Sequence, residues 1–132
     1  MNAKRVLVVE DIEMNRKVVR IVLKAKGYEV LEASQAEEAL EILGVETPDL
    51  ILMDIALPGM SGEELTRQIK ANPQWCHLPI IALTASAMKG DREQFLDAGC
   101  DDYISKPIDT HALVELVNHY LSEEAKDDES AN

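Results

Sequence analysis

The chain has 132 residues, a length typical of one domain, and 46% of them are hydrophobic, enough to build a buried core. Its net charge of −12 argues against nucleic acid as a partner, because phosphate contacts need clustered Lys and Arg. Cys76 and Cys100 match no zinc or redox spacing, and no apolar stretch has the length of a signal peptide or a membrane helix. We therefore expect a cytoplasmic protein that binds proteins or cations and does not enter a membrane.

Short apolar segments recur along the chain at regular intervals. The first, third and fourth are nearly continuous runs of Val, Ile and Leu, which is typical of strands buried on both faces. The five predicted strands cover Arg5–Glu10, Tyr28–Ala33, Asp49–Asp54, Pro79–Thr84 and Asp101–Ser105.

Segments with helical periodicity lie between these strands. Their predicted inward faces are Met14, Val18, Ile21, Val22 and Ala25; then Ala36, Ala39, Leu40 and Leu43; and, near the end, Ala112, Leu113, Leu116, Val117, Tyr120 and Leu121. Helix starts are indicated by capping-box spacing, and helix ends by Gly or by Asn-Pro. The signals are Ser34 with Glu37, Ser61 with Glu64, Gly27, Gly44, Gly99 and Asn72-Pro73.

Five strands alternating with five helices predict an α/β fold, a doubly wound parallel sheet with helices on both faces. We assign residues 1–122 to this one domain. The remaining residues, 123–132, are mostly acidic and polar, and we expect them to form a disordered tail.

Polar side chains stand where the predicted strands end, and these ends meet at one edge of a parallel sheet. Glu10 and Asp11 follow the first strand, Asp54 ends the third, Thr84 ends the fourth, and Lys106 follows the fifth. Three crowded carboxylates repel one another, and Mg2+, which prefers oxygen ligands, would relieve the repulsion. Lys106 is expected to pair with one carboxylate and Thr84 to add a neutral donor. A nucleophile, a metal, a cation and a donor are the parts that phosphoryl transfer needs.

The sequence resembles the receiver domain of two-component response regulators. The resemblance runs from about Lys4 to Leu121 and implies the flavodoxin-like (βα)5 fold with strand order 2-1-3-4-5. Four motifs carry it: VLVVEDIEMN at 6–15, PDLILMDIALPGMSGEEL at 48–65, PIIALTASA at 79–87 and AGCDDYISKPID at 98–109.

The resemblance implies a role for each residue at the sheet edge. Asp54 is implied as the phosphoacceptor, Asp11 as the main acidic Mg2+ ligand with Glu10 acting through water, and Lys106 as the family's lysine. Asp54 and the backbone carbonyl of Ala56 are implied as further Mg2+ ligands. Thr84 and Tyr103 are implied as the switch pair, and the Lys106–Pro107 peptide bond as cis.

Three positions depart from common family patterns. Glu10 is one carbon longer than the more frequent Asp, Ile12 adds an apolar group at the rim of the site, and Ala56 has no polar side chain. In the family, the positions of Ala56 and Ser86 help to set how fast the acyl phosphate hydrolyses. The phosphoryl lifetime is therefore open.

We expect a stand-alone, chemotaxis-regulator-like receiver, monomeric or weakly dimeric. It takes a phosphoryl group from a phosphohistidine on a histidine kinase or phosphotransfer protein and then binds a downstream protein differently. It is not an enzyme beyond catalysing its own phosphorylation and dephosphorylation.

Four other interpretations of the sequence are less favoured. One is a receiver excised from a hybrid histidine kinase, disfavoured by the closeness of Met1 to the first strand. A haloacid-dehalogenase-type phosphatase needs an acid where Ala56 stands. A flavodoxin-like cofactor binder would place phosphate against Glu10 and Asp11, and a pseudo-receiver would not retain the full set of site residues.

Overall fold

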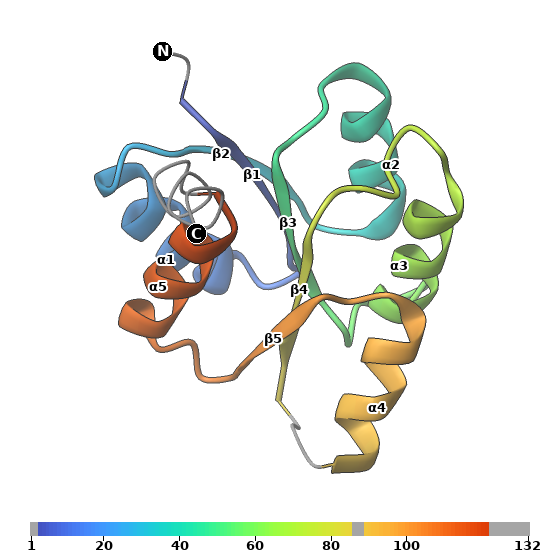
Figure 1. The fold of residues 1–132 in the computed structure, drawn as a ribbon. Helices are drawn as coiled ribbons and strands as arrows, with labels where there is room; N and C mark the ends of the chain where they lie inside the picture. Colours follow the sequence, from blue (N-terminus) through green and yellow to red (C-terminus); the bar gives the residue numbers. More distant parts are fainter. Residues whose placement is uncertain (1–2, 86–88, 122–132) are drawn as a thin grey trace, which may run out of the picture.

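A computed structural model describes residues 3–85 and 89–121 of the chain. Its centre is one parallel sheet with strand order β2-β1-β3-β4-β5, which confirms the predicted architecture (Figure 1). The strands are β1 (Arg5–Val9), β2 (Glu29–Ala33), β3 (Leu50–Asp54), β4 (Ile80–Thr84) and β5 (Asp102–Ser105). The predicted tail at 123–132, and Ser86, lie outside the described residues.

Five helices cover the two faces of the sheet. The pair α1 and α5 lies on one face, and α2, α3 and α4 lie on the other (Figure 1). Their bounds are α1 Glu13–Ala25, α2 Ala36–Val45, α3 Gly62–Ala71, α4 Lys89–Ala98 and α5 Thr110–Leu121. In the described part of the chain, none of these helices is long and apolar enough to cross a membrane.

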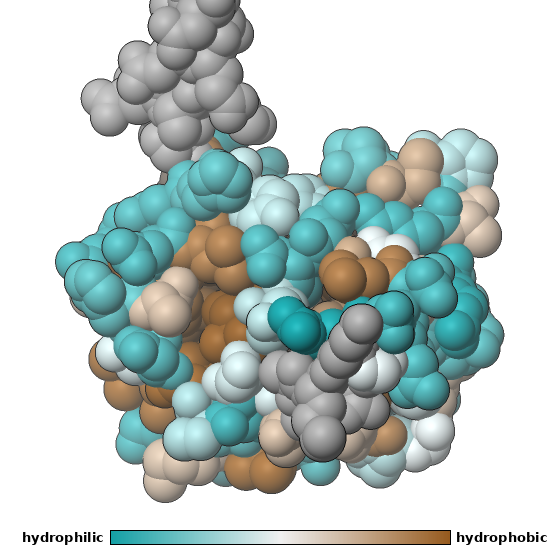
Figure 2. Space-filling model, turned by 60° about the horizontal axis from the view of Figure 1, so that its bottom comes forward, coloured by the Kyte–Doolittle hydropathy of each residue, from teal (hydrophilic) through white to brown (hydrophobic). Residues whose placement is uncertain are grey.

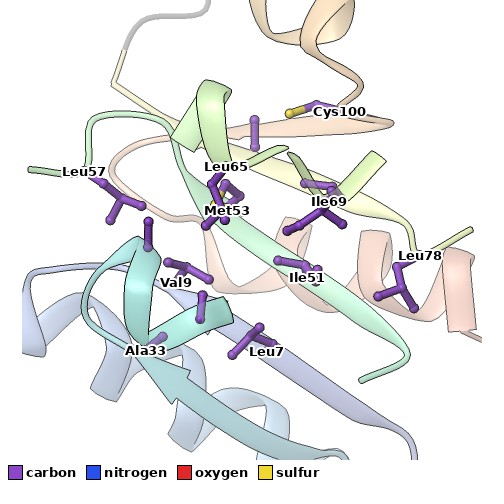
Figure 3. Packing of buried hydrophobic residues seen from close by; sticks show 14 of the residues in the cluster. Leu7, Val9, Ala33, Ile51, Met53, Leu57, Leu65, Ile69, Leu78 and Cys100 are labelled. Carbon is purple, nitrogen blue, oxygen red and sulfur yellow. The ribbon is translucent and has the colours of Figure 1, made fainter. Parts of the chain in front are cut away.

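The core is split in two by the sheet, because successive residues of a strand point to opposite faces. Every residue of β3 and β4 is buried, as expected for strands covered on both sides. On one face Met53 of β3 lies beside Leu65 of α3 (Figure 3). On the other, Leu52 packs with Leu23 of α1 and Val117 of α5. Each such fully buried side chain contributes about 1.5–3 kcal/mol.

The predicted inward face of α1 was only partly right. Val19 and Leu23 are the buried residues of this helix, whereas Met14 is 65% exposed and Ile21 55% exposed. Two apolar stripes, offset by one residue and hence by about 100°, run along this segment, and periodicity cannot choose between them. Packing against the sheet buries Val19 and Leu23 most deeply. Val18 and Val22 are partly buried, and Met14, Ile21 and Ala25 face outward. The inward faces of α2 and α5 were predicted correctly, apart from Ala112, which is exposed.

Helix boundaries follow local signals at most ends. Ser61 caps α3 by accepting a hydrogen bond from the Glu64 N–H at 3.2 Å, as predicted. Gly27 and Gly99 have φ of +93° and +119°, the left-handed conformation that ends a helix most readily at Gly. Asn72 is the C-terminal cap of α3.

Two boundary predictions at α2 were wrong. The carboxylate of Glu38, rather than that of Glu37, accepts hydrogen bonds from the Ser34 N–H and hydroxyl, at 2.6 and 3.0 Å. The helix begins at Ala36, one residue later than the capping box requires. Gly44 lies inside α2, which runs on to Val45.

Gly62, the first residue of α3, packs directly on the strand end that presents Asp54. A Cβ atom at this position would overlap the Asp54 carbonyl oxygen and lie 2.9 Å from its carbonyl carbon. Both contacts are with backbone, which cannot rotate away as a side chain can. The loop from β3 to α3 therefore returns to the strand end only because this residue has no side chain.

We predict that Gly62→Ala lowers the free energy of unfolding by about 3 kcal/mol, since overpacking against backbone forces β3 or α3 to move. Gly44→Ala is the matched control: nothing lies within 4 Å of its Cβ position, and Ala is favoured in a helix by up to about 1 kcal/mol. Urea denaturation of the two variants measures both effects. Equal stabilities would contradict the close approach at Asp54.

Candidate functional site

Three carboxylates meet at the carboxyl edge of the sheet, at the bottom of Figure 1. Glu10 and Asp11 follow β1, Asp54 ends β3, and one oxygen from each lies within 4.8 Å of the others. Glu10 is fully buried, Asp54 is 2% exposed and Asp11 is exposed. Figure 2, which turns this end forward, shows brown apolar surface among hydrophilic teal around the edge.

Lys106 supplies the positive charge at this edge. Its Nζ lies 2.9 Å from Glu10 Oε1 and 3.3 Å from Asp54 Oδ1, so it pairs with two carboxylates rather than the one we predicted. The backbone places it: the Lys106 N–H donates to the Thr84 carbonyl at 2.7 Å, and the Lys106–Pro107 bond is cis. Lys106 therefore bridges β1 and β3 from a loop that follows β5.

The local electrostatics favour a protonated or neutralised site. Burial raises the pKa of Glu10, the charge of Asp54 adds to the rise, and the hydrogen bond from Lys106 only partly opposes it. Burial would lower the pKa of Lys106, but its hydrogen bond to Glu10 and the charge of Asp54 raise it overall. Burial, Asp54 and the Glu10–Lys106 contact therefore act on both pKa values.

The donor set fits a divalent metal ion. Three carboxylates against one ammonium leave two negative charges in excess, and their oxygens are close enough to share one ion. Hard cations such as Mg2+ bind carboxylate oxygens together with backbone carbonyls and waters. The Ala56 N–H donates to Asp54 Oδ1 at 3.0 Å, which fixes the turn that carries the Ala56 carbonyl. The site could therefore hold a metal through Glu10, Asp11 and Asp54.

Thr84 and Tyr103 lie on the same face of the sheet. Tyr103 pairs in register with Ala82, and Thr84 stands two residues further along β4, so their side chains point the same way. Thr84 is buried, and Tyr103 is partly buried with its ring 5.6 Å from that of Phe95 on α4. Thr84 follows Leu83, which pairs in register with Asp54 of β3, and Tyr103 lies on the next strand, β5.

Two arginines at the site were missed from the sequence. Arg92 of α4 lies over the Tyr103 ring, 5.8 Å from its centroid, and its Nη1 is 3.3 Å from the Tyr103 hydroxyl. Arg16 of α1 donates to the Glu10 carbonyl at 2.8 Å. Neither contact has a sequence signal, because each joins residues whose proximity depends on how a helix packs on the sheet.

The comparisons with known proteins agree with this geometry. The model of the response regulator receiver domain family matches residues 6–118. The chain belongs to this family. Among curated proteins, the receiver domain is 45% identical over 120 residues to the polar-differentiation response regulator DivK of Brucella anthropi, covering 91% of this chain and 98% of that protein.

Solved structures of receivers superpose closely on this chain. One is the receiver domain of a sensor histidine kinase from Pseudomonas aeruginosa PAO1 with magnesium coordinated in its active site cleft: 36% identity, TM-score 0.82, covering 89% of this chain and 97% of that one. Another is the receiver domain of the Saccharomyces cerevisiae response regulator Ssk1, solved with the phosphotransfer protein Ypd1: 30% identity, TM-score 0.85, covering 94% and 92%.

This protein is thus a receiver-domain response regulator of two-component signalling, and not a conventional enzyme. Receiver domains have histidine kinases or phosphotransfer proteins as partners. The haloacid-dehalogenase and flavodoxin-like cofactor-binding alternatives are set aside, since neither belongs to this family.

The raised pKa of Glu10 gives a testable pH dependence. Because its pKa is higher in the folded than in the unfolded chain, stability from Glu10 is fully present below the usual value of 4.5 and is lost as the pH rises through the raised value. Glu10→Gln removes this loss. In metal-free buffer, we predict that Glu10→Gln gains stability relative to wild type as the pH rises from about 4 to about 7.

Urea denaturation at the two pH values measures the change. The exposed Glu37, replaced by Gln, is the matched control and should show a smaller pH-dependent difference. A difference for Glu10→Gln that stays constant or shrinks as the pH rises would exclude the proposed cost of ionising Glu10.

Proposed function

We propose that this receiver takes a phosphoryl group onto Asp54 from a phosphohistidine of a histidine kinase or phosphotransfer protein. The observation that carries the proposal is the position of Asp54: a buried carboxylate at the end of a rigid strand, between two more carboxylates and Lys106. Strand residues on a packed sheet hold a nucleophile more firmly than a loop does.

The transfer forms one bond and breaks one. An Asp54 oxygen attacks the phosphorus, the bond from phosphorus to the histidine nitrogen breaks, and the imidazole leaves with the bonding electrons. Lys106, already 3.3 Å from Asp54 Oδ1, is placed to contact an incoming phosphoryl oxygen. Mg2+, held by Glu10, Asp11, Asp54 and the Ala56 carbonyl, would offset the negative charge of the transferring group.

The surface beside the site suits a kinase or phosphotransfer protein. Ile12 and Met14 are 51% and 65% exposed at the start of α1. Next to them lies a hollow of about 510 Å³ lined by Asn15, Val18, Lys106, Pro107 and Ile108. An apolar surface that includes the site lysine would exclude water from the transfer. The Ssk1 receiver, solved with a phosphotransfer protein, is a precedent for such a partner.

Output would use the face around Tyr103. A new phosphoryl charge on Asp54 draws the Thr84 hydroxyl inward, and the Tyr103 ring follows into the space left. Arg92 holds that ring from α4 by stacking and a hydrogen bond, so it takes part in the change. A groove of about 560 Å³ between β5 and α5 includes Tyr103 and Leu116 in its lining, and we propose it for a downstream protein.

Net charge and family membership support the proposed partners and compartment. The net charge of −12 disfavours nucleic acid, and a receiver must meet its kinase in the cytoplasm. We propose a monomer or weak dimer there. The phosphoryl lifetime, for which Ala56 and Ser86 are the relevant positions, requires measurement.

We predict that a small phosphoryl donor with Mg2+ adds one phosphoryl group to the wild type, at Asp54, and none to Asp54→Asn. Asp11→Asn should remove both the Mg2+ dependence of the reaction and the Mg2+-induced rise in Tm, because it removes a metal ligand. Intact mass and peptide mapping measure the product. Asp97→Asn, at an exposed position of α4, is the control and should react normally. Modification of Asp54→Asn would refute the assignment.

A second prediction separates the two surfaces. Thr84→Ala should leave phosphorylation of Asp54 largely intact and reduce the phosphorylation-dependent gain in affinity for the downstream target. Ile12→Asp should slow phosphotransfer from the kinase and leave target binding unchanged, because it puts a charge into the apolar docking surface. A phosphotransfer assay and target binding with a phosphate mimic compare the variants. An undiminished gain in Thr84→Ala would rule out the switch.

A further inference from the structure

The loop between β1 and α1, residues 10–12, carries two of the three carboxylates, and the Arg16 side chain binds its first residue. Arg16 Nη1 donates to the Glu10 carbonyl at 2.8 Å, and the Arg16 backbone N–H donates to the Ile12 carbonyl at 3.2 Å. Ile12 stands at the N-cap of α1 and makes no side-chain capping bond. The Arg16 side chain thus binds the first residue of the loop, whereas its backbone N–H makes the ordinary hydrogen bond of the first helical turn.

Arg16 is itself anchored to the sheet. Its Nε lies 3.3 Å from Glu32 Oε1 on β2, and its side chain is only 17% exposed. Arg20, one turn further along α1, holds both oxygens of the same carboxylate, at 2.8 and 2.7 Å. The guanidinium of Arg16 therefore lies between Glu32 of β2 and the Glu10 carbonyl, with the shorter of the two bonds to the carbonyl.

We infer that Arg16 is a positioning residue that orients Asp11 for the metal ion. The Glu10 carbonyl and the Asp11 N–H belong to one rigid peptide plane, so a bond that fixes the carbonyl oxygen also fixes where the Asp11 side chain starts. The Glu10 N–H is fixed from the other side by the Ala33 carbonyl at 3.0 Å. The inference rests on the proposed function, since it requires a Mg2+ site at Asp11.

A purely electrostatic role and a positioning role of Arg16 predict opposite changes in Mg2+ affinity when Arg16 is replaced. Arg16 is a cation close to the carboxylates, so the Coulomb term alone would make its removal strengthen Mg2+ binding. Loss of positioning would weaken Mg2+ binding, by about tenfold or more for a group that orients a metal ligand. The sign of the change in affinity therefore distinguishes the two roles.

The test measures the Kd of Mg2+ by calorimetric titration of wild type, Arg16→Met, Arg16→Lys and Arg20→Met at constant ionic strength. Arg20→Met is the matched control: it removes a cation and two bonds to Glu32 from the same helix but no bond to the loop. We expect Arg16→Met to raise the Kd about tenfold or more and Arg20→Met to leave it within about twofold. Arg16→Lys keeps the charge, lacks the forked donor, and should also raise the Kd.

Three outcomes would overturn the inference: an unchanged Kd in Arg16→Met, a lower Kd, or an equal rise in Arg20→Met. If Arg16→Met does not fold, Arg16→Lys decides alone, and a wild-type Kd in that variant is the overturning result. Absence of Mg2+ binding by the wild type is a different outcome, because it refutes the metal site of the proposed function.

Discussion

Repulsion among the carboxylates of Glu10, Asp11 and Asp54 is the constraint on which the rest of this structure depends. Two of the three are buried, where a charge costs most, and a single ammonium, that of Lys106, touches both buried ones. Burial raises the pKa of Glu10, the Asp54 carboxylate adds to the rise, and this ammonium only partly opposes it. A cluster of carboxylates like this one is stable only on a firmly packed sheet. It attracts a cation, or a group that carries a cation with it.

The residues at the sheet edge differ in how tightly they are packed. Asp54 ends a strand that is buried throughout, and Gly62 packs against its carbonyl, so the backbone that carries this carboxylate is tightly packed. Thr84 and Tyr103 lie toward the edge of the sheet, where Tyr103 is only partly buried and is held by Arg92 and Phe95. The proposed switch would thus act at the β5 surface, outside the fully buried strands β3 and β4.

The apolar surface of α1 shows how a failed prediction can point to function. Met14 and Ile21 were assigned to the core because they fit a helical stripe, yet they are exposed. Helical periodicity identifies the apolar positions of a helix, but it does not show which apolar stripe packs against the sheet. Asn15 and Val18, which follow Met14 on α1, line a hollow with Lys106, so apolar surface at the start of α1 is available to a partner on this side of the site.

The sequence by itself determined the five strands, the parallel sheet and the edge where Glu10, Asp11, Asp54, Thr84 and Lys106 gather, because buried runs and strand ends are local patterns that parallel topology collects in one place. It could not determine that Lys106 bridges two carboxylates, that Arg16 holds the Glu10 carbonyl, or that Arg92 covers Tyr103. Those contacts join different elements through long, flexible side chains. Only the way that α1, α4 and the β5–α5 loop pack on the sheet decides which partners these side chains can reach.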